Sequence, residues 1–130
     1  MTLAGRYRRF AHLEARGKSP LYEQLALGVA DDPAVQAVLA RVAPAKQQPN
    51  LLFATVSFLG GVQPGYGAFR AFVLDHADAV VATLQTRRTQ TNEVARCATL
   101  LPVLARLRGP LALLEVGASA GLCLLPDRYA

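Results

Sequence analysis

The chain has 130 residues, of which 52% are hydrophobic and 18% are charged. This length and apolar content support a folded domain with a sizeable core, and they exclude a disordered chain. The longest uncharged apolar stretch, residues 51–62, is well short of the ~20 residues that a membrane helix needs. The N-terminus has basic residues but no apolar segment of a signal peptide. We therefore expect a cytoplasmic protein with no membrane partner.

Positive charge gathers at two places in a chain whose formal net charge is +5. Arg6, Arg8 and Arg9 lie near the start, and Arg87 and Arg88 form a pair. The pI of about 9.8 is in the range of nucleic-acid-binding domains. The other basic residues are scattered among acids and long apolar spans. We therefore interpret the arginines as solvated helix faces and expect no nucleic-acid partner, with a phosphate contact as the alternative.

Apolar residues recur at helical spacing through most of the chain. The spacing predicts a bundle-like domain of about six helices, which cover residues 3–17, 20–29, 33–42, 51–59, 69–84 and 94–105. Ser19-Pro20 and Asp32-Pro33 are typical helix starts, because proline is tolerated at the first helical position and the preceding side chain caps free amides. His76 lies on the apolar face of the fifth helix and is predicted to be a core residue.

The two cysteines, Cys97 and Cys123, lie in no CxxC motif and no Cys/His cluster. This spacing predicts buried thiols and neither a disulfide nor a metal site.

A polar segment separates the last two predicted helices and is a candidate substrate cleft. Amide side chains offer hydrogen bonds, and arginine offers a clamp for a carboxylate or phosphate. The candidate substrate-binding residues are Gln90, Asn92, Glu93 and Arg96. The competing interpretation is an exposed loop between helices that also caps the second of them.

Residues 111–116 are apolar on both faces, as in a buried parallel strand, and a run of small residues follows. The sequence thus predicts a helical domain over residues 1–109. The first short strand, turn and helix start of an incomplete Rossmann-like α/β unit follow over residues 110–130. A lone strand cannot satisfy its own hydrogen-bond ladder. We therefore expect the chain to be a fragment of a longer protein.

The turn at residues 115–121 has two functional interpretations. It resembles the first motif of S-adenosylmethionine-dependent methyltransferases, which implies cofactor contacts from Glu115, Gly117, Ser119 and Gly121. The same residues also match the G-x-S-x-G nucleophile elbow of α/β-hydrolases, with Ser119 as the nucleophile, although no histidine follows it. The competing interpretation is a tight turn that binds nothing.

Several stretches together resemble an uncharacterised family of actinobacterial proteins, domain of unknown function 2332. They are residues 19–23, residues 88–94 with Arg96, residues 100–102, residues 113–121 and residues 127–129. Cys123 departs from the family pattern, which has asparagine there. The resemblance implies a helical N-terminal part that leads into a Rossmann-like part continuing beyond residue 130, and it implies no established activity.

The leading hypothesis is that the intact protein binds S-adenosylmethionine and transfers a methyl group to an unknown substrate. The acid that usually contacts the ribose lies ~20 residues beyond such a glycine turn, so we expect the 130-residue chain to be inactive as an enzyme. One alternative is a helical interaction or regulatory module without enzymatic activity, which self-associates through its apolar C-terminal segment. The other is an α/β-hydrolase fragment.

Overall fold

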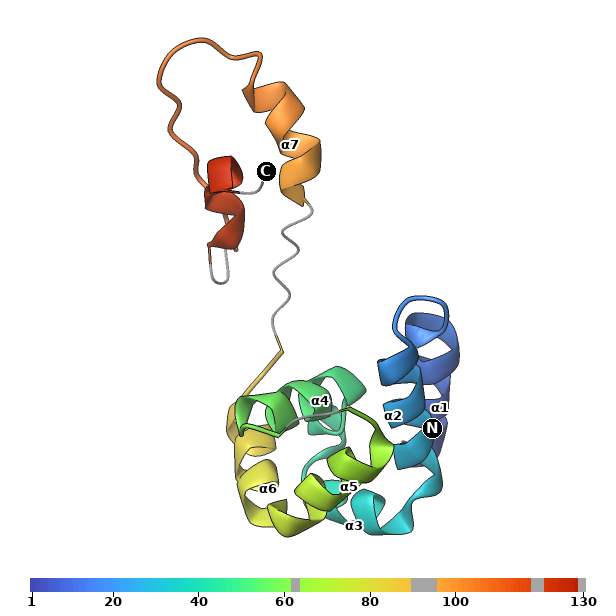
Figure 1. Ribbon diagram of the computed structural model, residues 1–130. Coiled ribbons are helices and arrows are strands. Elements are labelled where there is room, and N and C mark those ends of the chain that lie inside the picture. The colour runs from blue at the N-terminus through green and yellow to red at the C-terminus, as the bar shows by residue number, and fades with distance from the viewer. Residues whose placement is uncertain (62–63, 90–95, 118–120, 129–130) are drawn as a thin grey trace. The chain divides into compact units, whose positions relative to one another are not determined.

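A computed structural model describes residues 1–61, 64–89, 96–117 and 121–128 of the chain. The chain forms two compact units, Met1–Thr89 and Gln90–Ala130. Every regular element of the described residues is helical (Figure 1), which confirms the mainly helical class. The units are defined by their internal contacts and do not test the domain boundary near residue 109, which stays a prediction.

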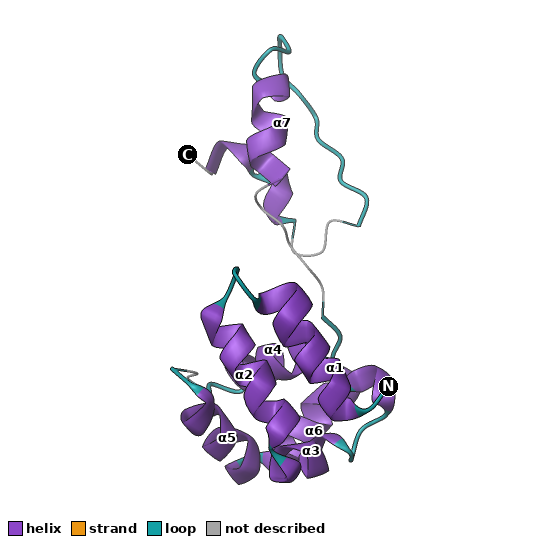
Figure 2. Ribbon diagram, turned by 90° about the vertical axis from the view of Figure 1, so that its right-hand side faces the viewer, coloured by secondary structure: helices purple, strands orange, loops and turns teal. Residues whose placement is uncertain are grey.

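Six α-helices form the described part of the first unit. Helices α1 and α2 make a hairpin whose connection includes a π-helical turn, and α3 to α6 pack beside this hairpin (Figure 2). A 3-10 turn, Pro44–Lys46, leads from α3 to α4. The helices are α1 Leu3–Phe10, α2 Pro20–Asp31, α3 Pro33–Leu39, α4 Pro49–Phe58, α5 Tyr66–Asp75 and α6 Ala77–Thr86.

Side-chain caps set the starts of α2 and α3. The hydroxyl of Ser19 accepts a hydrogen bond from the Tyr22 amide at 3.3 Å, and Oδ1 of Asp32 accepts one from the Ala34 amide at 2.9 Å. A proline follows each cap at the start of the helix, where its missing N–H costs nothing. Both predicted helix starts are therefore confirmed.

The fully buried ring of Phe53, on α4, lies at the centre of the core. The ring of Tyr22 from α2 lies 5.0 Å away between centroids, and that of Phe69 from α5 lies 5.7 Å away. Phe10 and Tyr7, both from α1, follow at 6.0 Å and 6.4 Å. Such pairs each contribute roughly 0.5–1.5 kcal/mol beyond their burial. Phe53 therefore ties α1, α2 and α5 to α4.

The single helix predicted over residues 69–84 is wrong, because the segment forms two helices. Helix α5 ends at Asp75 and α6 begins at Ala77, since the backbone of His76 leaves the helical region with φ −116° and ψ 28°. The His76 ring stacks on Phe72 with centroids 4.2 Å apart. His76 is exposed, so the prediction of a core histidine is also wrong.

Asp32 joins α5 to the junction between α2 and α3. Its Oδ2 accepts hydrogen bonds from the Tyr66 hydroxyl at 2.9 Å and from Nε of Arg70 at 2.6 Å. Burial by itself would raise the pKa of this carboxyl. The hydrogen bonds from Tyr66, Arg70 and two α3 amides outweigh burial and hold the pKa below its ordinary value. Asp32 therefore works in the fold as a carboxylate.

Tyr66 lies against Gly28 of α2. A Cβ atom built on Gly28 would overlap the Tyr66 ring, so the close approach of α5 to α2 requires a residue without a side chain here. The requirement comes from this contact and not from backbone freedom, because Gly28 lies inside α2 and is not among the residues with positive φ.

The second unit contains α7, Arg96–Leu104, and two 3-10 turns, Leu122–Leu124 and Pro126–Arg128. The strand predicted over residues 111–116 is wrong, because residues 111–115 have no regular secondary structure and residue 116 lies in a turn. A strand needs a neighbouring strand to pair its amides and carbonyls, and the described residues offer none. The Rossmann-like unit is likewise not seen there.

We predict that Gly28→Ala lowers the free energy of unfolding by about 1–3 kcal/mol, because the new methyl group displaces the Tyr66 ring. Urea unfolding followed by circular dichroism measures the change. Gly67→Ala, on α5, is the matched control. Apart from its chain neighbours and the backbone of its own helix, no described atom lies within 4 Å of a methyl group added there. A Gly28→Ala protein as stable as the Gly67→Ala protein would contradict the contact.

A second prediction concerns pH. Because the pKa of Asp32 is lowered in the folded state, its contribution to stability is present above the unfolded value of about 4 and is lost as pH falls through the folded value. Asp32→Asn should therefore cost about 1–3 kcal/mol at neutral pH, and the difference from the unmodified protein should shrink below pH ~4. Unfolding measured across this pH range checks it. Asp78→Asn, whose side chain is 92% exposed in its ion pair with Arg41, should change little at any pH.

Candidate functional site

The turn after Glu115 has two left-handed glycines. Gly117 has φ +76° and Gly121 has φ +72°, in a region that other residues rarely adopt. No described atom lies within 4 Å of a Cβ built on Gly117, so its backbone borders open space. The backbone here thus has the freedom that the sequence predicted from its glycines.

Glu115 holds a buried acceptor beside this turn. Its Oε2 atom is buried and has no hydrogen-bond partner among the residues that the structure describes. Burying an acceptor without a donor costs about 1–3 kcal/mol, so such atoms in folded proteins call for an explanation. A ligand that donates hydrogen bonds is one.

The second unit also contains two cysteines, Cys97 and Cys123, and the charge of Glu115 acts on the second of them. The Sγ atom of Cys97, on α7, lies 3.8 Å from the carbonyl oxygen of Cys123, and both cysteines are buried, as predicted. Burial raises the pKa of the Cys123 thiol, and so do the carboxylate of Glu115 and the neighbouring Cys97, whereas Arg96 lowers it. Because Arg96, Cys97 and Glu115 all act on the pKa of this thiol, we call the four residues together the Cys123 cluster.

Two of the predicted residues share an electrostatic influence on the same thiol. Arg96, a candidate for substrate binding, and Glu115, a candidate for cofactor binding, both act on Cys123. Gln90, Asn92, Glu93 and Ser119 lie outside the described residues. The hydrolase hypothesis depends on Ser119 and stays a prediction.

Sequence reasoning missed the two cysteines as members of this cluster. They are 26 residues apart, a separation that matches no metal or redox motif. The one signal in the sequence was Cys123 itself, at a position where the family resemblance led us to expect asparagine.

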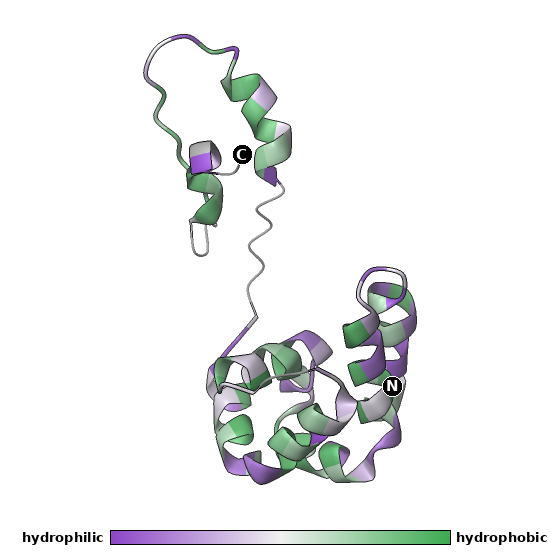
Figure 3. Cartoon of the chain, in the orientation of Figure 1, coloured by the Kyte–Doolittle hydropathy of each residue, from purple (hydrophilic) through white to green (hydrophobic). Residues whose placement is uncertain are grey.

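The second unit exposes large apolar side chains. Leu114 is 92% exposed and Val116 is 94% exposed, and hydrophobic residues recur along α7 and the segment after it (Figure 3). Exposed apolar surface of this kind is typical of contacts with another molecule. Self-association through this segment stays a prediction.

The described part of the chain holds no group of three or more histidine, cysteine and acidic side chains placed to bind a metal ion. None of its helices is long and apolar enough to span a membrane. The cytoplasmic location stays a prediction.

These features define a mainly helical protein in which two left-handed glycines follow an acid, and one oxygen of that acid has no hydrogen-bond partner among the described residues. The chain belongs to the family described as "Uncharacterized protein conserved in bacteria (DUF2332)", which matches residues 4–130. This confirms the family resemblance, while the actinobacterial source and the methyltransferase motif stay predictions. A comparison with curated proteins finds no match, and a comparison with solved structures finds none either.

The Cys123 cluster predicts opposite effects of two substitutions on thiol reactivity. Glu115→Gln removes a negative charge and should lower the pKa of Cys123, so alkylation of this thiol at neutral pH should become faster. Arg96→Gln removes a positive charge and should make it slower. Mass spectrometry of the peptides that contain Cys97 and Cys123 separates the two rates. Equal rates in both variants would show that these charges do not reach Cys123.

Proposed function

We propose that the Glu115 turn binds S-adenosylmethionine. The observation that carries the proposal is the buried Oε2 atom of Glu115, which has no hydrogen-bond partner among the described residues and lies two residues before the left-handed Gly117 and six before the left-handed Gly121. A carboxylate in this state accepts hydrogen bonds from hydroxyl or amino groups, and the cofactor has both kinds of donor. The likeness of residues 115–121 to the first methyltransferase motif supports the same assignment.

The residues present fit a nucleoside cofactor in three respects. Glu115 supplies an acceptor that the described residues leave unused. Gly117 borders open space, so a ligand can approach its backbone without meeting a side chain. Arg96 supplies a positive charge in the same cluster, and an arginine pairs well with the carboxylate at the amino-acid end of the cofactor.

Each residue then has a distinct role. Glu115 orients the ligand by accepting hydrogen bonds. Binding is strengthened because the buried Oε2 atom gains a donor from the ligand. Gly117 and Gly121 keep the turn open, because a side chain at either position is strained at its φ value. S-adenosylmethionine, when bound, supplies an activated methyl group. Methyl transfer to a substrate of unknown identity is the activity that we propose for the family.

The test is a titration of the full chain with S-adenosylmethionine, followed in amide NMR spectra. We expect the largest shifts at Glu115, Gly117 and Gly121, even when the Kd is as weak as about 1 mM. Glu115→Gln should weaken binding by about tenfold or more, the usual effect of losing a hydrogen bond to a charged group.

The control is Glu23→Gln, which makes the same chemical change in the first unit, where Glu23 pairs with Arg16. It should leave binding unchanged. A folded chain whose spectrum does not respond to the cofactor, or responds only in residues 1–89, would overturn the proposal.

A further inference from the structure

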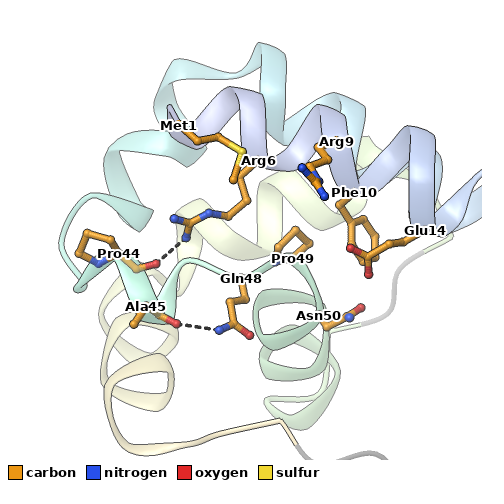
Figure 4. A pocket seen from close by; sticks show the side chains of 10 residues that line it. All are labelled: Met1, Arg6, Arg9, Phe10, Glu14, Pro44, Ala45, Gln48, Pro49 and Asn50. Carbon is orange, nitrogen blue, oxygen red and sulfur yellow. Dashed lines mark hydrogen bonds between the residues drawn. The ribbon is translucent and has the colours of Figure 1, made fainter.

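Two hollows adjoin on the surface of the first unit. One has a volume of about 430 Å³ and lies between α1 and the segment that leads into α4 (Figure 4). The other has a volume of about 450 Å³ and is lined by that same segment and the residues that follow α6. Ala45 and Gln48 line both. Each hollow alone is within the ~300–1,000 Å³ range of small-molecule sites, and we call the two together the basic groove.

The lining of the basic groove is strongly positive. Its charged side chains include one carboxylate, that of Glu14, and five cations, which are Arg6, Arg9, Lys46, Arg87 and Arg88. The fold thus places arginines from both positive clusters of the sequence, which lie about 80 residues apart, along one groove. Their positive charges repel one another across it.

The arginines of the first unit divide into two sets. Four form ion pairs with carboxylates, and all of them lie outside the groove: Arg8, Arg16, Arg41 and Arg70. The four that line the groove form no ion pair with any carboxylate of the described residues. The first unit therefore concentrates its guanidinium groups without a carboxylate partner at one concave site. If the arginines were only solvated surface residues, there would be no reason for the paired and the unpaired ones to lie in different places.

Hydrogen bonds hold the shared wall of the groove in place. Arg6 donates to the carbonyl oxygen of Pro44, and the Lys46 ammonium donates to the carbonyl oxygen of Arg87 at 2.6 Å. The guanidinium of Arg87 lies over the Phe58 ring, 4.8 Å from its centroid. These contacts join the segment before α4 to α1 and to the end of α6, so three of the five cations, Arg6, Lys46 and Arg87, are positioned before a ligand arrives.

We propose that the basic groove binds a linear oligophosphate, either free or as the phosphate chain of a nucleotide. Guanidinium groups match phosphate oxygens in geometry and charge. A single phosphate fits one hollow and leaves the cations of the other unpaired, whereas a chain of phosphates pairs with both sets. Glu14 and Asn50 lie at the end of the first hollow away from Pro44 (Figure 4). The carboxylate of Glu14 therefore directs the anion toward Arg6 and the shared wall.

The experiment is isothermal titration of the full chain with inorganic tripolyphosphate, with a nucleoside triphosphate and with inorganic phosphate, at one ionic strength. We expect both triphosphates to bind at least about tenfold more tightly than phosphate, because they span both hollows. A nucleoside triphosphate that binds more tightly than tripolyphosphate identifies the nucleotide as the source, and equal affinities identify the free chain.

The variant is the double substitution Arg9→Gln with Arg88→Gln, one from each hollow. It should weaken tripolyphosphate binding by about tenfold or more. The matched control, Arg8→Gln with Arg41→Gln, removes the same charge from arginines outside the groove and should change binding less than about twofold. Equal losses in both variants show a nonspecific effect of net charge and overturn the proposal. So does a folded chain that binds no triphosphate, or one that binds a single-stranded oligonucleotide far more tightly than either triphosphate.

Discussion

The first unit depends on the contact of four aromatic rings with Phe53. Three other helices reach this one side chain of α4, at centroid distances from 5.0 to 6.4 Å. Several of these helices have ten residues or fewer, and helices this short are unstable alone in water. Their stability therefore comes from packing, and Phe53 is the point at which most of that packing meets.

The same contact prepares the functional surface. Phe10 packs against Phe53 and also lines the first hollow, and Pro49 begins the helix that carries Phe53 and lines it too. The position of α1 relative to α4, and with it the width of the hollow, is thus set from inside the core. Repulsion among the arginines at the surface is offset by this buried packing, which is common where charge is concentrated for binding.

Features that depend on residues close together in the sequence could be predicted, and features that depend on distant residues could not. The caps at Ser19 and Asp32 depend on neighbouring residues, and both were predicted correctly. The break at His76 was missed because the apolar spacing continues across it. Residues 111–116 have the composition of a strand, but pairing is not a local property, and the described residues offer no partner strand. Glu115 was singled out from its motif, whereas its proximity to Cys123 and the meeting of the two arginine clusters depend on the tertiary fold.

The contact between Gly28 and Tyr66 also has a consequence for how this family can diverge. Tyr66 reaches Asp32 while its ring lies against a position without a side chain, so this contact depends on all three residues, while Asp32 also caps α3. A smaller residue at position 66 removes the reason for glycine at 28 and leaves the carboxylate of Asp32 with one donor fewer from α5. We therefore expect substitutions at positions 28, 32 and 66 to be correlated among members of the family.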